Sequence, residues 1–314
     1  MLTEEERIKA LERPHGKSVK AVLDTDTYNE VDDQFALIYA LLSPKVDLEA
    51  VFAAPFFNER SNGPADGMEK SYQEILKILH ILKIPADGFA WRGSPEYMTE
   101  KNKPVDSPAA RRLIELAHEA DQPLRVLTIG CATNVASALT IDPEIADQIV
   151  VVWLGGHSRD WPHTNEFNLM QDVYASQILF DSGVPLVRFP CSRVSELLLT
   201  TIPELEACLA GRTAVGDYLV DTVRRYAPQD ERRLGWSKVI WDIITVAWID
   251  CPLALTTALV PTPRLVGDKM TPKDELCFNL DFSRPLCREG IHVNRDLVFS
   301  RLFNLINSQA KGPD

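Results

Sequence analysis

The sequence predicts an α/β fold with an open, mostly parallel central sheet flanked by helices. Apolar runs rich in β-branched residues alternate with segments of helical length and period through the first two thirds of the 314 residues, which is the rhythm of βαβ units. The runs are almost continuously apolar, as strands buried on both faces are. No Gly/Ser-rich or Pro-rich linker divides the chain. We therefore expect a single domain over residues 1–314.

Five apolar runs in the first two thirds are short enough to be buried parallel strands. They lie at residues 21–23, 48–53, 124–129, 149–154 and 185–189. The segments between them repeat apolar residues at helical spacing. We therefore expect helices that include residues 34–42, 68–82 and 109–120.

The last third is predicted from caps and periodicity. Pro203 directly follows Ile202, which suits the first turn of a helix. Residues 241–249 are apolar enough for a buried helix, and residues 277–282 alternate as a strand with one wet face does. Residues 296–306 are expected to form a closing helix.

Composition narrows the function classes. The formal net charge of −12 disfavours nonspecific binding to nucleic acid or to anionic lipid, because both would be repelled. No stretch approaches the length of a membrane span, and the first residues lack the apolar core of a signal peptide. The six cysteines show neither CxxC nor zinc-ligand spacing. We expect a cytoplasmic protein with reduced thiols and a small-molecule substrate.

A cluster of acids follows the first predicted strand. Asp24, Asp26, Glu30, Asp32 and Asp33 lie within ten residues, at a strand end where open α/β sheets place ligands. So many close negative charges repel one another unless they are protonated, solvated or bridged by a cation. A hard divalent ion is the simplest explanation. The alternative for the last two acids is that they cap the following helix.

Three further segments carry polar groups at predicted strand or helix ends. Small residues over 129–134 let a backbone approach a ligand closely. Glu166 and Asn168, two apart in extended backbone, would point the same way and offer a carboxylate and an amide to vicinal hydroxyls. Asp242 precedes a strongly apolar helix and is either its cap or a buried ligand that needs a cation.

In this order, these segments resemble the inosine-uridine nucleoside hydrolase family. The family signature D-x-D-x-G-x-D-D resembles DTDTYNEVDD at residues 24–33, and its TGPLTN turn resembles IGCATN at residues 129–134. Its GG followed by EFN resembles Gly155, Gly156 and residues 166–168, and its HDP-x-AVA helix resembles WDIITVA at residues 241–247. The agreement extends over nearly the whole chain.

The resemblance implies calcium-dependent hydrolysis of the N-glycosidic bond of a nucleoside or related riboside, in purine or pyrimidine salvage. Asp26 would be the general base on a calcium-bound water and lie at the ion, with Asp33, Asp242 and the backbone carbonyl of Ile129 as ligands. The residues that the resemblance implies in ribose binding are Asp32, Glu166 and Asn168. We also expect substrate contacts from Asn58, in a loop more polar than that of the family, and from Trp241, whose ring could stack on a base. Family members are commonly dimers or tetramers, so a homo-oligomer is expected.

Three departures from the family pattern bear on the site. Five residues separate Asp26 from Asp32 where the family has three, so the loop must bulge or bring Asn29 or Glu30 into the site. Trp241 stands where many members have the histidine that protonates the leaving base, and an indole cannot do so. Asp160 replaces an asparagine expected at the 5′-hydroxyl. His157 or His163 could supply the missing acid, although solvated loop histidines are the simpler interpretation of both.

Two alternative functions start from the same residues. The strand followed by Asp24-x-Asp26 also resembles the motif of haloacid-dehalogenase-type phosphatases, in which Asp24 would be phosphorylated, Thr128 would bind phosphate, and Gly267-Asp268 with Asp274 would hold Mg²⁺. The EFN segment has no role in that chemistry. The other alternative is a calcium-dependent ribose-binding protein without catalysis.

Overall fold

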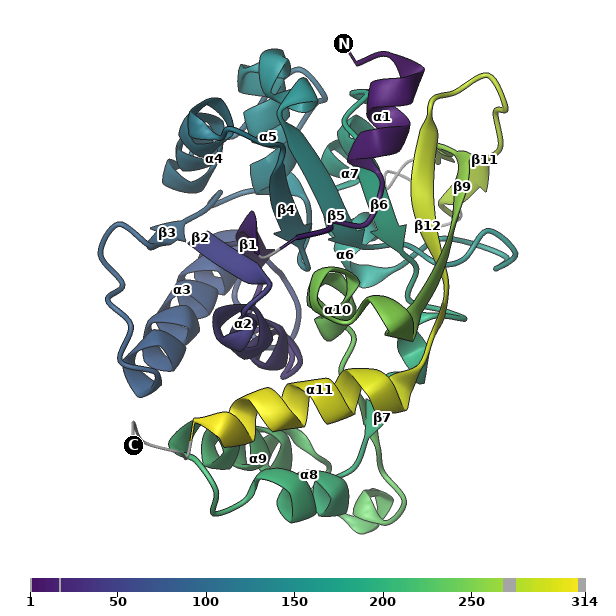
Figure 1. Ribbon diagram of the computed structural model, residues 1–314. Coiled ribbons are helices and arrows are strands. Elements are labelled where there is room, and N and C mark those ends of the chain that lie inside the picture. Colours follow the sequence, from purple (N-terminus) through teal and green to yellow (C-terminus); the bar gives the residue numbers. More distant parts are fainter. Residues whose placement is uncertain (1, 17, 268–274, 310–314) are drawn as a thin grey trace.

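The computed structural model describes residues 2–16, 18–267 and 275–309. Within these residues, eight strands form one sheet in the order β3-β2-β1-β4-β5-β6-β12-β9 (Figure 1). Neighbouring strands pair in parallel except β12 and β9, which are antiparallel. The strands are β1 (Val19–Thr25), β2 (Val46–Ala53), β3 (Ala90–Arg92), β4 (Leu124–Thr128), β5 (Ile149–Leu154), β6 (Leu186–Phe189), β9 (Leu255–Pro261) and β12 (Leu286–Val293). The predicted open, mostly parallel sheet is confirmed.

Helices cover both faces of this sheet. Val22 and Leu23, neighbours on β1, pack into two different hydrophobic clusters, because successive side chains of a strand point to opposite faces. The first cluster includes residues of α2 (Asp33–Leu42), α3 (Pro64–Ile81), α8 (Ile202–Leu209), α9 (Ala214–Tyr226), α10 (Ile243–Asp250) and α11 (Arg295–Ser308). The second includes residues of α4 (Pro108–Glu119), α5 (Thr133–Ile141), α6 (Phe167–Gln171) and α7 (Val173–Asp181). A short helix, α1 (Glu4–Ala10), precedes β1.

Several predicted boundaries are corrected. The first strand continues through Asp24 to Thr25, and the buried helix of the last third begins at Ile243 rather than at Trp241. The strand predicted at 277–282 is shorter: β11 (Cys277–Asn279) pairs with β10 (Arg264–Val266) in a separate two-stranded sheet. A second small sheet joins β7 (Leu199–Thr200) to β8 (Lys238–Val239). β3, β9 and β12 were not predicted: β3 has three residues, β9 lies at the edge of the sheet, and β12 contains Arg288 and Glu289 and so is not a continuous apolar run.

The strand order places a switch point at the middle of the sheet. From β1 the chain builds outward through β2 to β3, and β4 then returns to the other side of β1. At such a point the loops after the two adjacent strands diverge and leave a crevice at their carboxyl ends. Asp26 follows β1 and Ile129 follows β4, so both stand at this crevice. Strands from the beginning and the end of the chain share this sheet, which supports the single domain that we propose.

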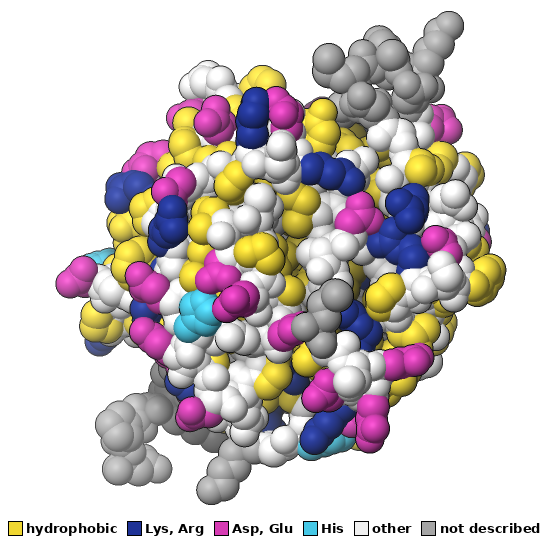
Figure 2. All heavy atoms as spheres, turned by 90° about the horizontal axis from the view of Figure 1, so that it is seen from above, with side chains coloured by type: hydrophobic (Ala, Val, Ile, Leu, Met, Phe, Trp, Pro, Cys, Tyr) yellow, Lys and Arg dark blue, Asp and Glu magenta, His cyan; other side chains and the backbone are white. Residues whose placement is uncertain are grey.

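No helix among the described residues is long and apolar enough to cross a membrane. Figure 2 shows one face of the molecule, on which acidic side chains are interspersed with basic and hydrophobic ones.

Candidate active site

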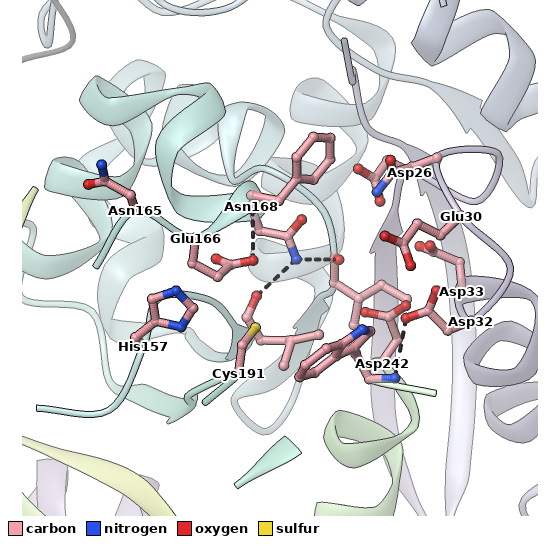
Figure 3. A pocket seen from close by; sticks show the side chains of 15 residues that line it. Asp26, Glu30, Asp32, Asp33, His157, Asn165, Glu166, Asn168, Cys191 and Asp242 are labelled. Atoms are coloured by element: carbon pink, nitrogen blue, oxygen red, sulfur yellow. Dashed lines mark hydrogen bonds between the residues drawn. The ribbon is translucent and has the colours of Figure 1, made fainter. Parts of the chain in front are cut away.

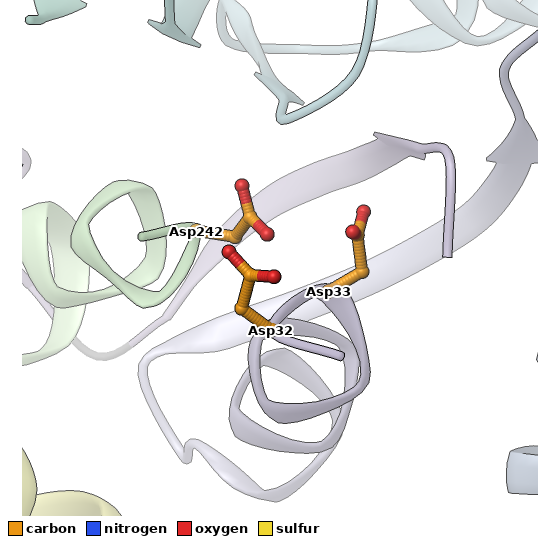
Figure 4. A group of neighbouring side chains, drawn as sticks. All are labelled: Asp32, Asp33 and Asp242. Carbon is orange, nitrogen blue, oxygen red and sulfur yellow. The ribbon is translucent and has the colours of Figure 1, made fainter. Parts of the chain in front are cut away.

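Three carboxylates from distant parts of the chain meet at the crevice. Asp32 and Asp33 stand at the start of α2, and Asp242 directly precedes α10. Each offers an oxygen that lies within 4.8 Å of the oxygens offered by the other two (Figure 4). All three side chains are buried. The acids at the start of α2 do not act as side-chain caps there, since Asp32 makes no capping hydrogen bond.

These carboxylates line one end of a cavity of about 250 Å³. The cavity brings together nearly all residues that the resemblance implies, namely Asp26, Asp32, Asp33, Ile129, Glu166, Asn168, Trp241 and Asp242. Asn29 and Glu30 also line it, so the longer loop after Asp26 does bring both into the site. Figure 3 shows the aspartates and Glu30 on one side of the cavity and Glu166, Asn165 and His157 on the other.

Asp26 is the least satisfied of these groups. Its side chain is 1% exposed, and neither carboxylate oxygen has a hydrogen-bond partner among the described residues. Burial, and then the neighbouring charges of Asp33 and Asp32, raise its pKa well above the ordinary aspartate value. A buried carboxylate without donors is costly, and a cation or a ligand proton relieves that cost.

The pKa values of Asp33 and Asp242 are raised as well. Burial and then the charge of Asp32 raise the pKa of Asp33 to about 7, although the Thr25 hydroxyl donates to it at 2.5 Å. Burial and then Asp33 raise the pKa of Asp242 well above its ordinary value. Carboxylate and carbonyl oxygens are the ligands that Ca²⁺ prefers. The donor set therefore fits a hard divalent cation.

Asp32 differs because it has protein partners. The backbone N–H of Trp241 donates to its Oδ2 at 3.2 Å, and the Lys238 ammonium lies 3.2 Å from its Oδ1. Lys238 also forms an ion pair with Glu30. Burial opposes the charge of Lys238, but the carboxylates of Asp32 and Glu30 outweigh it and raise the lysine pKa. Sequence reasoning missed Lys238, because a single lysine on a two-residue strand carries no pattern.

The backbone at Glu166 and Asn168 differs from the extended conformation that the sequence predicted. Glu166 is the N-cap of α6 and Asn168 lies inside that helix, so the two do not point together from an extended segment. Glu166 accepts hydrogen bonds from the backbone N–H groups of Gly156, Asn168 and Leu169 at 2.8–3.0 Å. Both side chains still line the cavity. A polar residue directly before a partly apolar segment, here Glu166 before residues 167–170, is a signal for the start of a helix.

Asn168 joins the ends of two strands. Its Nδ2 donates to the carbonyl oxygens of Ile129 at 2.8 Å and of Leu154 at 3.1 Å (Figure 3). This bridge fixes the carbonyl of Ile129 at the cavity. A carbonyl oxygen has two lone pairs, so that of Ile129 retains one for a cation.

Two predicted contacts lie outside the cavity. Asn58 does not line it; its Nδ2 donates to Oδ1 of Asn29 at 2.6 Å, so it reaches the site only through that residue. Asp160 is exposed and accepts from the Ser158 hydroxyl, while Asn165 lines the cavity instead. The loop between β5 and α6 is irregular, so spacing from Glu166 did not indicate which residue faces inward.

His157 lines the cavity, whereas His163 packs beside it with ring centroids 5.6 Å apart. Burial, and then the charges of His163 and Arg188, lower the pKa of His157 below its ordinary value. Phe167 and Cys191 also line the cavity and were not predicted. Phe167 lies inside the EFN motif but is the apolar residue between the two polar ones, and Cys191 belongs to none of the motifs.

The phosphatase alternative loses its nucleophile. Asp24 is fully buried within β1, where it accepts a hydrogen bond from Asn134 Nδ2 at 2.8 Å, and it does not line the cavity. Its register partner on β4 is Thr128, also fully buried. Gly267 is described, but Asp268 and Asp274, the expected Mg²⁺ ligands, lie outside the described residues.

Comparisons with known proteins identify the family of this chain. Residues 21–273 match the family described as inosine-uridine preferring nucleoside hydrolase. A pyrimidine-specific ribonucleoside hydrolase of Salmonella enteritidis is 26% identical over 252 residues, which cover 72% of this chain and 78% of the relative. A purine-preferring ribonucleoside hydrolase from Gardnerella vaginalis superposes with a TM-score of 0.72 at 24% identity, covering 93% of this chain and 99% of that one. A plant nucleoside hydrolase has a TM-score of 0.70 at 22% identity, covering 92% and 99%. This chain therefore belongs to the inosine-uridine preferring nucleoside hydrolase family, whose members cleave N-ribosyl bonds.

Proposed function

We propose that this protein hydrolyses the N-glycosidic bond of a ribonucleoside or related riboside in a calcium-dependent reaction, with Asp26 as the general base. The observation that carries the proposal is the convergence of Asp26, Asp32, Asp33 and Asp242 in one buried cavity. Of these four, only Asp32 has a cationic partner among the described residues. The cluster comes from two distant segments and has more carboxylates than cations. A bound cation and a substrate diol explain this excess of negative charge.

The residues that would hold Ca²⁺ are Asp33, Asp242 and the carbonyl of Ile129, with Asp26 beside them. Asp32 also offers an oxygen within the same group. Ca²⁺ takes six to eight oxygen ligands, so a ribose diol can complete its shell. When bound, the ion lowers the pKa of the attacking water.

Asp26 is suited to take a proton from that water. Both of its oxygens are free of described partners, and burial with the charges of Asp33 and Asp32 raises its pKa well above the ordinary aspartate value, which makes the carboxylate a stronger base. A general base works best when its pKa is near the working pH. The oxocarbenium-like character of glycosidic cleavage places positive charge on the sugar, and the surrounding carboxylates favour that charge.

The substrate contacts we propose follow the two sides of the cavity. Asp32 is held by Trp241 and Lys238 and faces the diol. Asn168 and Glu166 face the sugar from the other side, although both also hold backbone groups. The Trp241 side chain lines the cavity and offers a flat surface to a base.

Departure of the base needs a proton that the cavity supplies poorly. Trp241 has no acidic proton, and the lowered pKa of His157 leaves that imidazole neutral at neutral pH. His157 can therefore form a hydrogen bond to the leaving base, but it does not carry the extra proton that a general acid would donate. We expect activated ribosides to be cleaved faster than inosine, since their leaving groups need no protonation.

The test is a hydrolysis assay on purified protein with its metal content measured in parallel. We expect stoichiometric Ca²⁺, and release of base from at least one nucleoside or of 4-nitrophenolate from 4-nitrophenyl riboside. Chelation should abolish turnover, and added Ca²⁺ should restore it. Protein without a divalent metal that hydrolyses none of these would contradict the proposal. Tight nucleoside binding without turnover would support the ribose-binding alternative instead.

We also propose that the chain works as a homo-oligomer in the cytoplasm, as the family resemblance implies. Light scattering of the purified protein and fractionation of cells test these two statements separately.

A further inference from the structure

Glu30 is the one carboxylate of the cavity that the resemblance does not assign. It stands in the loop between Asp26 and Asp32 and lines the same cavity. Its side chain is 37% exposed, whereas the side chain of Asp32 is 4% exposed. Glu30 is thus the acid of this side that is most accessible to a ligand entering from solvent.

Two cationic side chains contact Glu30, one at its carboxylate and one at its backbone carbonyl. The Lys238 ammonium binds its Oε2, and that lysine side chain is 7% exposed and does not line the cavity. The Arg60 guanidinium donates to the backbone carbonyl of Glu30 at 3.2 Å. No described residue donates a hydrogen bond to Oε1 of Glu30. The carboxylate is therefore fixed in place with one acceptor oxygen left over.

Trp241 is linked to the same side of the cavity as Glu30. Trp241 lines the cavity, and its backbone N–H donates to Asp32, which shares Lys238 with Glu30. The Tyr226 ring lies 5.8 Å from the Lys238 ammonium but does not line this cavity. The aromatic surface of Trp241 favours a planar group stacked beside it.

The opposite side of the cavity is arranged differently. There Glu166 accepts three backbone N–H groups, and Asn168 donates to two carbonyls. A furanose whose diol rests on the aspartates has its C1′ and C4′ carbons on opposite sides. The His157 ring also lies on the side of Glu166, so an aromatic surface alone does not distinguish the two sides. Glu30 combines an exposed carboxylate with the neighbouring Trp241 ring, and we assign the aglycone to that side.

We propose that Glu30 is a specificity residue that accepts an N–H hydrogen bond from the aglycone, and that Lys238 is the positioning residue that holds it. The inference rests on the proposed hydrolase function and names the substrate class: ribosides whose base presents an N–H donor on its edge. Aglycones that carry a carboxylate are repelled by Glu30. Ribosides without an N–H donor are accepted but gain nothing from it.

The experiment compares substrates that differ in one hydrogen. Uridine is matched with 3-methyluridine, inosine with 1-methylinosine, and 4-nitrophenyl riboside serves as an aglycone without any N–H. In the wild-type protein with Ca²⁺, we expect the methylated base of each pair to have a kcat/KM about tenfold or more lower. Glu30→Gln keeps the size of the side chain but turns an amide N–H toward the base, because Lys238 retains the oxygen.

Glu30→Gln should lower kcat/KM for uridine and inosine by about tenfold to a hundredfold, mainly through KM, because a hydrogen bond to a charged acceptor is lost. It should leave 4-nitrophenyl riboside, Ca²⁺ affinity by calorimetry and thermal unfolding unchanged, and remove the discrimination against methylated bases. Lys238→Arg should restore part of the discrimination that Lys238→Met loses.

The outcomes separate this inference from the function on which it rests. An equal loss on nucleosides and on 4-nitrophenyl riboside would mean that Glu30 acts on the sugar or the ion, and would overturn the inference alone. Unchanged kinetics on every substrate would also overturn it. A wild-type protein that cleaves neither the nucleosides nor the activated riboside would remove the hydrolase function, and the inference with it.

Discussion

The two sides of the cavity differ in how many hydrogen-bond donors they provide to a buried acid. On what we call the carboxylate wall (Asp26, Asp32, Asp33 and Asp242), Asp26 has no hydrogen-bond donor among the described residues. On the capping wall (Glu166 and Asn168), Glu166 accepts three backbone N–H groups at the start of α6. Both acids are more than nine-tenths buried. Burial alone therefore does not identify a ligand site; the missing donors do, because the fold leaves that charge for something else to satisfy.

The largest effect is expected from Asp26→Asn on the carboxylate wall. The amide cannot take a proton from water, so kcat should fall by about a thousandfold, within the range for removing a general base. The same change should stabilise the calcium-free protein, because it removes a buried charge that repels Asp33 and Asp32. Initial rates with 4-nitrophenyl riboside and thermal unfolding in chelator measure the two effects.

Asp24→Asn is the matched control for that variant. Asp24 is also a fully buried aspartate from the β1 region, but it has a partner in Asn134 and does not line the cavity. We expect the control to retain turnover. Loss of activity in Asp24→Asn together with normal activity in Asp26→Asn would contradict the assignment of the base.

The next effect concerns pH and calcium together. The pKa of Asp33 is raised to about 7, and those of Asp26 and Asp242 are raised well above the ordinary 3.8. The folded state therefore holds these protons more tightly than the unfolded state. Their contribution to stability is fully present below about pH 4 and is lost as pH rises through about 7. The calcium-free protein should unfold at a lower temperature at about pH 8 than at about pH 5.

Calcium should flatten that pH dependence, because it binds the deprotonated carboxylates. At a free concentration one hundred times its Kd, the ion adds about 2.7 kcal/mol to the free energy of unfolding. Scanning calorimetry in chelator and in excess Ca²⁺ measures both slopes. A midpoint in chelator that rises from about pH 5 to about pH 8 would contradict the picture of an overcharged wall.

The two walls also differ in how well the sequence predicts them. The carboxylate wall could be predicted, because four acids at a strand end and before an apolar helix form a pattern that solvation alone does not explain. Even there, the sequence did not reveal Lys238, which comes from a two-residue strand paired with β7. The capping wall was placed correctly at the cavity, but the shape of its backbone was predicted wrongly. A cap and an extended pair share the same residue types, and only three-dimensional packing decides between them.

Dependence on three-dimensional packing also explains which strands of the sheet could be predicted. Buried central strands with long apolar runs were predicted within a few residues, whereas β3, with three residues, and β9, at the antiparallel edge, were missed. Such strands are defined by the neighbours they pair with rather than by their own periodicity. The site depends on the central strands, which is why it could be predicted although the sheet edges could not.

A smaller effect is expected on the capping wall from Glu166→Gln. One amide oxygen cannot replace two carboxylate oxygens that together accept three backbone N–H groups, so the free energy of unfolding should fall by about 1–2 kcal/mol. In contrast to Asp26→Asn, this loss should appear equally with and without Ca²⁺. Urea unfolding in both conditions measures it. A variant that is stabilised, or destabilised only when calcium is present, would place Glu166 on the carboxylate side of the comparison.

The smallest effect is expected from Asn58→Ala, which lies outside both walls. Asn58 contacts Oδ1 of Asn29 through Nδ2 and accepts from the Arg60 backbone N–H at 2.8 Å. Its loss removes these two neutral hydrogen bonds and a longer one of 3.5 Å to the Asn29 carbonyl, at a half-buried loop. Each is worth about 0.5–1.5 kcal/mol at most. The effect on catalysis should be confined to a small rise in KM, because Asn29 loses a partner but stays in the cavity wall. Steady-state kinetics test this, and a large fall in kcat for Asn58→Ala would show that the substrate extends beyond the two walls to the loop after β2.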